Sequence, residues 1–233
     1  MRAPAGVAPS FDLASLLFYT RFQYEQGARQ QMRLVVVGGQ GRKVGKTSVI
    51  AGLIRGLKTL AWTAVKISHH AEDTGTEDAP LADDLPAHLD FLLSEEKDRE
   101  GHGDTALYLA AGARRALWLR TRGGGLARAL PGLLEALAGD GHVIVESNSL
   151  LGFLKPDIFL MVIDQSGRDV KTSAREFLAR ADAFVTAESS LEPNALAATA
   201  LELPQDKPVF AVSAIDWSNP ALCRFVSERL ARS

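Results

Sequence analysis

The sequence predicts an α/β fold, with a mainly parallel sheet covered by helices on both faces in a three-layer arrangement. Short apolar runs alternate with helix-length amphipathic segments, which is the pattern of strands joined by crossover helices. Most of the short runs are apolar over four or more consecutive residues, as expected for strands that are buried on both faces. A length of 233 residues suits one large α/β domain, so we expect a single domain at residues 33–233 and an N-terminal extension at residues 1–32.

The individual elements follow from this alternation. Strands are expected at residues 33–37, 62–67, 116–120, 143–146, 158–163, 183–186 and 209–213. Helices are expected at residues 46–57, 104–113, 126–137, 170–180, 193–201 and 219–232, with one more at residues 11–31 in the extension. Asp104 and Asn219 are residue types that cap the first turn of a helix. Residues 69–89 are acidic and contain Gly and Pro, which predicts a long loop after the second strand.

The composition argues against several classes of protein. A formal net charge of −2 disfavours a nucleic-acid-binding protein that relies on a basic surface. The single cysteine cannot form an internal disulfide, and no apolar run reaches the roughly 18 to 20 residues that span a bilayer. The first ten residues lack the basic start and apolar run of a signal peptide, so we expect a cytoplasmic protein that does not bind a membrane.

The strongest motif is the glycine-rich segment at residues 38–48, between the first predicted strand and the helix that follows it. A phosphate chain needs unobstructed backbone N–H groups, a lysine for its terminal oxygens, a hydroxyl group for Mg²⁺ and a helix N-terminus. The segment offers all of these, and the expected binding residues are Gly39, Gly41, Arg42, Lys43, Val44, Gly45, Lys46, Thr47 and Ser48. The strict G-x-x-x-x-G-K-[ST] pattern requires glycine where the chain has Gln40, so the loop is either one residue longer or differently wound.

Three further charged residues are expected at the ligand edge of the sheet. Glu146 ends an apolar strand, and open α/β sheets bind ligands beyond the carboxyl ends of their strands, so Glu146 and Thr47 are candidate Mg²⁺ ligands. Lys66 interrupts an apolar strand and either neutralises phosphate charge or extends to solvent from an edge strand. Asp104 either caps a helix or orients a water molecule or a Mg²⁺ ligand. We therefore expect Lys46, Lys66 and Asp104 as catalytic residues.

The sequence offers weaker evidence on other metal sites and on the nucleotide base. His69 and His70 are adjacent, but no spacing of His and Cys residues matches a structural zinc site, so we expect solvated loop histidines. The Asn-Lys-x-Asp guanine signature is absent. Polar residues within 182–188 or within 213–216 are alternative base readers, and both guanine and adenine stay open.

Taken in order, these motifs resemble the B protein of molybdopterin-guanine dinucleotide biosynthesis (MobB), a family of P-loop nucleotide-binding proteins, and more loosely dethiobiotin synthetase. The resemblance spans residues 33–165, and its first part is the glycine-rich loop. The other matches are residues 64–70 against the family's Lys-His-x-His-His, Gly103-Asp104-Thr105 and Ala111-Gly112-Ala113 against Gly-Lys-Asp-Ser and Ala-Gly-Ala, and Val145-Glu146 against Val-Glu-Gly. The departures are Ser147-Asn148-Ser149 in place of Gly-Phe-Lys and Gly103 in place of a lysine.

The resemblance implies a P-loop NTPase that binds GTP and Mg²⁺, hydrolyses the nucleotide slowly or with stimulation by a partner, and assists molybdenum cofactor biosynthesis. It implies that Lys46 and Thr47 serve the phosphates and Mg²⁺, that Glu146 serves Mg²⁺, that a cofactor-assembly enzyme is a partner and that the chain forms a homodimer. One alternative is an ATP-dependent small-molecule kinase or ligase of the dethiobiotin-synthetase type, in which the acidic loop, His69 and His70 line an acceptor pocket. Another is an interaction module with a degenerate loop, against which the intact Gly45-Lys46-Thr47 argues.

Overall fold

The computed structural model describes residues 32–41, 43–70, 85–86, 88–164, 172–188 and 203–232. The strands formed by these residues are β1 (Arg33–Gly39), β2 (Thr63–His70), β3 (Phe91–Glu95), β4 (Arg115–Arg122), β5 (His142–Glu146), β6 (Ile158–Val162), β7 (Ala183–Ala187) and β8 (Val209–Val212). They make one sheet in the order β3-β4-β2-β5-β1-β6-β7-β8. Only β3 is antiparallel to its neighbour among these described strands, so the expected mainly parallel α/β sheet is confirmed.

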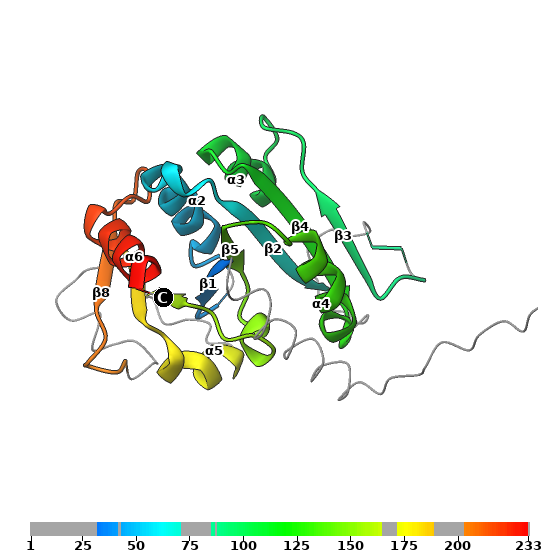
Figure 1. Ribbon diagram of the computed structural model, residues 1–233. Helices are drawn as coiled ribbons and strands as arrows, with labels where there is room; N and C mark the ends of the chain where they lie inside the picture. Colours follow the sequence, from blue (N-terminus) through cyan, green and yellow to red (C-terminus); the bar gives the residue numbers. More distant parts are fainter. Residues whose placement is uncertain are drawn as a thin grey trace, which may run out of the picture.

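Helices cover both faces of the sheet, as expected (Figure 1). They are α2 (Lys46–Gly56), α3 (Asp104–Ala111), α4 (Gly125–Ala136), α5 (Thr172–Phe177) and α6 (Pro220–Arg232), with short 3-10 turns η2 (Lys58–Leu60), η3 (Ser149–Gly152) and η4 (Leu178–Arg180). Successive residues of a strand point to opposite faces, so Val35 and Val37 of β1 pack with α2, α3 and α6, whereas Leu34 and Val36 pack on the face of α4 and α5. The phosphate-loop helix α2 therefore shares its face with α3 and α6.

Strand β3 has no counterpart among the predicted strands. It pairs with β4 at the edge of the sheet, where its sequence Phe-Leu-Leu-Ser-Glu is exposed at both ends. An edge strand of this kind lacks the continuous apolar run by which the buried parallel strands are recognised. The seven predicted strands are all present, with bounds that differ by at most three residues.

Two other expectations are corrected at the ends of elements. His69 and His70 belong to β2, not to a loop, because β2 stays paired with β4 as far as Arg122. The helix predicted at residues 104–113 ends at Ala111, because Gly112 has a φ of 108° and closes the last turn in a left-handed conformation. The helices predicted at residues 11–31 and 193–201 and most of the acidic loop lie outside the described residues.

The position of β5 determines where the charged residues meet. It lies between β1 and β2, although it follows both of them in the chain by many residues. In this register Glu146 of β5 is the pairing partner of Val37 on one side and of Lys66 on the other. The end of β5 thus lies beside the end of β1, where the glycine-rich loop begins.

Candidate functional site

The glycine-rich loop is held at its start by Asn148. The Asn148 side chain accepts a hydrogen bond from the Gly39 N–H at 2.8 Å and donates one to the Gly39 carbonyl at 2.9 Å. A Cβ atom at Gly39 would lie 2.8 Å from the Lys46 side chain and 2.9 Å from that of Val44, so a larger residue here would require these side chains to shift. Asn148 comes from the segment after β5, and the sequence offered no motif that singles it out.

Gln40 replaces the glycine of the strict motif and has a structural role. It is buried, its N–H donates to the Val162 carbonyl at 2.9 Å, and its side-chain oxygen accepts from the Asp164 N–H at 3.1 Å. The loop therefore continues along β6 for one residue beyond β1. Both alternatives, a loop one residue longer and a differently wound loop, stay predictions, because Arg42 lies outside the described residues.

The rest of the loop leads into α2. Lys43 is exposed with a φ of 56°, Val44 packs partly against the core, and Gly45 occupies the N-cap with a φ of 93°. Ser48 lies half-buried in the first turn of α2. Of the expected phosphate-binding residues, Arg42 lies outside the described part of the chain.

The buried Glu146 carboxylate is the centre of the site. Its Oε2 atom accepts hydrogen bonds from the Thr47 hydroxyl at 3.0 Å and from the Tyr108 hydroxyl at 2.5 Å. Its Oε1 atom lies 3.2 Å from the Lys66 ammonium group and 3.9 Å from that of Lys46. Residues from β2, β5, α2 and α3 therefore meet at one carboxylate, as the strand-end position of Glu146 predicted.

Lys66 lies between two carboxylates. Besides Glu146, its ammonium group contacts the Asp104 carboxylate. Burial lowers the pKa of Lys66, but Glu146 and Asp104 raise it by more, so the pKa lies above its ordinary value and the side chain keeps its charge. Because β2 lies between β4 and β5, Lys66 does not extend to solvent from an edge strand, and that alternative is wrong.

Asp104 is the first residue of α3, and the N-cap position belongs to Gly103. The interpretation of Asp104 as an N-cap is therefore wrong, whereas Asn219 does cap α6 by accepting from the Leu222 N–H at 2.9 Å. The carboxylate of Asp104 instead pairs with Lys66 beside Glu146. Its position is compatible with the other alternative, a carboxylate near the phosphates.

Tyr108 is a site residue that no sequence motif singles out. It lies one turn after Asp104 in α3 and is fully buried. Burial first, and the charge of Glu146 second, raise the pKa of Tyr108 well above its ordinary value. The phenol thus stays protonated and donates its hydrogen to Glu146. A tyrosine among apolar helix residues is ordinary in a core, so only its spacing of four residues from Asp104 could have drawn attention to it.

The oxygen atoms of Thr47 and Glu146 suit a magnesium ion. Mg²⁺ prefers oxygen ligands in an octahedron with bonds of about 2.0–2.1 Å, so that neighbouring ligand oxygens lie about 2.9 Å apart. The 3.0 Å between Thr47 Oγ1 and Glu146 Oε2 matches that separation. A hydroxyl and a carboxylate beside a helix N-terminus are thus a donor set into which Mg²⁺ fits, with other positions left for water and phosphate oxygens.

A second polar chain lies at the same edge. The His69 ring contacts the Thr121 hydroxyl through Nδ1 at 2.9 Å and the Ser149 hydroxyl through Nε2. Ser149 is also 3.0 Å from the hydroxyl of Ser147, the residue after Glu146. His69 is thus held by hydroxyl groups near the carboxyl ends of β2, β4 and β5. Ser149 and Ser147 continue this polar chain to the residue next to Glu146.

The structure places the candidate base readers at different distances from the glycine-rich loop. Asp182 lies at the amino end of β7, where it accepts from the Phe159 N–H at 2.8 Å and pairs with Arg229 at 2.8 Å, so it is at the wrong edge to read a base. Glu188, at the other end of the predicted range, follows the carboxyl end of β7. Residues 213–218 form a closed turn in which the Trp217 N–H donates to the Ser213 carbonyl at 2.9 Å. The Trp217 ring lies against Gly45, so this turn is next to the loop.

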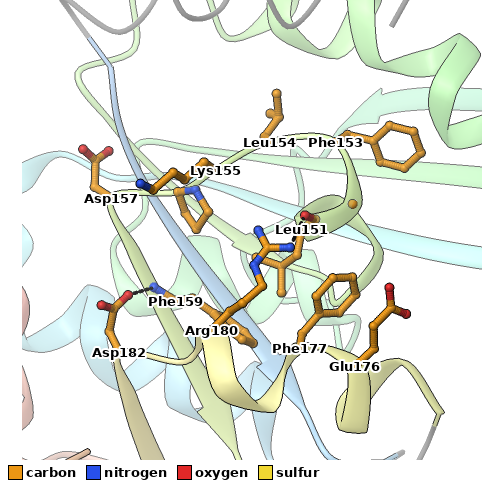
Figure 2. A pocket seen from close by; sticks show the side chains of 12 residues that line it. Leu151, Phe153, Leu154, Lys155, Asp157, Phe159, Glu176, Phe177, Arg180 and Asp182 are labelled. Atoms are coloured by element: carbon orange, nitrogen blue, oxygen red, sulfur yellow. Dashed lines mark hydrogen bonds between the residues drawn. The ribbon is translucent and has the colours of Figure 1, made fainter. Parts of the chain in front are cut away.

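A cavity of about 690 Å³ lies at the opposite edge of the sheet from the glycine-rich loop. Figure 2 shows Asp182, Asp157 and Phe159 around it, at the amino ends of β6 and β7, with Arg180 and Phe177 on its other wall. Both aspartates are engaged, since Asp157 accepts from the Leu34 N–H at 2.7 Å. Apart from Asp182, its lining contains none of the residues that the sequence singled out for phosphate, metal or base binding.

Comparison with solved structures supports the architecture. HypB from Helicobacter pylori in complex with nickel is similar over 94% of this chain and 95% of that chain, with a TM-score of 0.51 and 11% sequence identity. The chain and this structure thus share an α/β fold. LpxK from Aquifex aeolicus in complex with ATP is matched with a TM-score of 0.45 and 17% identity, over 85% of this chain and 64% of that chain. At 11% identity the likeness to HypB concerns the fold alone.

No family model and no curated protein matches the chain. The expected place in the MobB family thus rests on its motifs. Within the part of the chain that the structure describes, none of the helices has the length and apolar character needed to cross a bilayer.

Proposed function

We propose that the chain binds a nucleoside triphosphate together with Mg²⁺ at the glycine-rich loop. The observation that carries the proposal is the meeting of Lys46 and Thr47 of α2 and Lys66 of β2 at Glu146, where β5 ends between β1 and β2. Two lysines, a hydroxyl and a carboxylate at the start of α2 are the groups that a phosphate chain and its metal ion require.

Each residue has a distinct part in this proposal. Lys46 exchanges its contact with Glu146 for phosphate oxygens, and Lys66 does the same with its contacts to Glu146 and Asp104. The N–H groups of the loop and of the first turn of α2 bind the phosphate chain as well. Thr47 and Glu146 hold Mg²⁺, which neutralises charge on the phosphates when it is bound. Asp104, freed from Lys66, is available to orient a water molecule.

The test is a titration of the folded Lys46→Ala variant with Mg²⁺-nucleotide by calorimetry. A hydrogen bond to a charged group contributes about 1.5–3 kcal/mol, so the affinity is expected to fall by about ten- to a hundredfold. Lys58→Ala is the matched control, because Lys58 lies in η2, beyond the far end of α2, and its removal changes the net charge equally. Unchanged affinity in folded Lys46→Ala would mean that the nucleotide does not bind at this loop.

At a finer level, we propose a GTP-binding accessory protein of molybdenum cofactor assembly that acts as a homodimer with slow, partner-stimulated hydrolysis. The order of the four motifs along the chain supports this assignment. Competition between GTP and ATP measures the base preference, and hydrolysis measured with and without a cofactor-assembly enzyme tests the partner. A preference for ATP, or turnover that the enzyme leaves unchanged, would count against it.

The polar chain of His69, Ser149 and Thr121 favours a second candidate, an ATP-dependent small-molecule kinase or ligase. These groups lie where an acceptor molecule would approach the terminal phosphate. In this case His69→Ala lowers product formation with the correct acceptor but leaves nucleotide affinity unchanged. A screen in which no acceptor gains a phosphate or forms a new bond would exclude it.

A further inference from the structure

The buried phenol of Tyr108 directs its hydroxyl at the proposed metal ligands, and Glu146 accepts its hydrogen bond. Its ring belongs to the core cluster formed by α2, α3, α6 and one face of the sheet. Packing alone would be served by phenylalanine, and a buried hydroxyl without a partner destabilises a core. The Tyr108 hydroxyl donates at 2.5 Å to Glu146 Oε2, so its polar atom is directed at the carboxylate that we assign to Mg²⁺.

The contacts of Glu146 differ in what a bound nucleotide would do to them. Within the described part of the chain, its carboxylate is reached by Lys46, Lys66, Thr47 and Tyr108. Phosphate oxygens attract both lysines, and Thr47 is the expected metal ligand beside Glu146. Tyr108 is neutral and buried, so neither phosphate nor metal competes for it. Its hydrogen bond is the contact that persists when the site is loaded.

Helix α3 delivers this contact from a fixed position. Asp104 and Tyr108 are four residues apart and therefore lie on one face of the helix, where they meet Lys66 and Glu146. The first turn is held from outside the site, because the Thr105 hydroxyl donates to Glu96 at 2.9 Å. The helix is thus anchored at both its start and its inward face.

We propose that Tyr108 is a positioning residue that fixes the Glu146 carboxylate in the orientation in which it holds Mg²⁺ beside Thr47. This inference rests on the proposed function. Groups that orient metal ligands in this way typically change metal affinity by about ten- to a hundredfold when they are removed. In this role Tyr108 acts through Glu146 and is not itself a metal ligand.

The test compares nucleotide affinity in Mg²⁺ with affinity in EDTA, by calorimetry, for wild type and Tyr108→Phe. The ratio of the two affinities measures the contribution of the metal, and it is expected to fall by about tenfold in Tyr108→Phe. Nucleotide affinity in EDTA is expected to stay within about twofold of wild type, because no metal contributes to it. A purely structural defect would instead lower the affinity in Mg²⁺ and in EDTA alike. A wild-type ratio in folded Tyr108→Phe overturns the inference.

A double-mutant cycle with Glu146→Gln shows whether Tyr108 acts through the carboxylate. In the Glu146→Gln background, Tyr108→Phe should leave the ratio unchanged, whereas an equal fall in both backgrounds overturns the inference. Tyr108→Leu replaces the phenylalanine variant if that variant does not fold. Lys46→Ala separates the two proposals. If Lys46→Ala leaves nucleotide affinity unchanged, the proposed nucleotide site is wrong. If Lys46→Ala lowers nucleotide affinity but Tyr108→Phe keeps the wild-type ratio, only the proposed role of Tyr108 is wrong.

Discussion

Asn148 fixes the point at which β1 (Arg33–Gly39) becomes the glycine-rich loop, because one side chain binds both backbone groups of Gly39. An Asn148→Ala variant is expected to lose about 1–3 kcal/mol in the free energy of unfolding, since two hydrogen bonds are removed. Urea denaturation measures this change. Asn148→Asp keeps the acceptor for the Gly39 N–H but not the donor, so its free energy of unfolding should lie between those of wild type and Asn148→Ala. An unchanged urea midpoint for Asn148→Ala would contradict the role of Asn148 in holding Gly39.

Gly45 combines a positive φ of 93° with close contact to the Trp217 ring. A Gly45→Ala variant is therefore expected to be destabilised in two ways, by about 1–2 kcal/mol for the left-handed backbone and by a further amount for the clash. Combining it with Trp217→Ala should recover the second part only. Thermal unfolding of the two single variants and the double variant measures the coupling, and simple additivity would show that the ring does not limit position 45.

At this scale the sequence predicted the residues whose type carries the chemistry. Lys46, Thr47 and Glu146 stand in a recognisable order, and the structure brings them together. Asn148 and Tyr108 could not be predicted, because both residue types are ordinary at their positions. Their partners are 109 and 38 residues away, so their role appears only when the strands are aligned.

The start of α3 (Asp104–Ala111) is supported by Glu96, the residue after β3. Its Oε1 atom accepts from the N–H groups of Lys97 and Asp98, both at 2.9 Å, and its Oε2 atom accepts from Thr105 at 2.9 Å. The N–H of Asp98 is the largest cause that lowers the pKa of Glu96; burial opposes it, and the Thr105 hydroxyl lowers the pKa further. A carboxylate that several donors hold in this way supports the folded state in its charged form.

This arrangement gives α3 a defined dependence on pH. Because the folded pKa lies below the ordinary value of 4.5, the stabilising contribution is present above about pH 4.5 and is lost as the pH falls through the folded pKa. The stability difference between wild type and Glu96→Gln should therefore be constant near neutral pH and shrink in acid. Denaturant unfolding at pH 7 and at pH 3.5 measures it. A difference that grows in acid would be incompatible with the lowered pKa.

Among the elements, β3 shows where prediction from sequence ends. Hydrophobic runs identified the buried parallel strands because both of their faces require apolar residues. At the edge of the sheet, β3 needs neither a continuous apolar run nor an alternating one, and its residues are recognisable as a strand only through their pairing with β4. The order of the strands was also beyond reach, since periodicity does not say which strand will lie between β1 and β2.

For the whole molecule, the single cysteine reports on the packing of α2 against α6. Cys223 is half-buried, with its Sγ atom against Gly56, and burial raises the pKa of its thiol. We expect alkylation near pH 8 to be slower than that of a free thiol, because less thiolate is present and access is limited. Kinetics with an iodoacetamide reagent, followed by mass spectrometry, measure the rate. Labelling as fast as in urea-unfolded protein would show that α6 does not stay on α2.

The central place of β1 also has a consequence during synthesis of the chain. Both neighbours of β1, β5 and β6, follow it from far along the sequence, and Gly39 meets Asn148 across 109 residues. At about 5–20 residues per second, the ribosome needs roughly 5 to 20 seconds to supply them. During that time an almost wholly apolar strand has no partner in the sheet. Ligand capture by the loop therefore has to wait until β5 and β6 have been synthesised, but it does not need β7, β8 or α6, which come later in the chain.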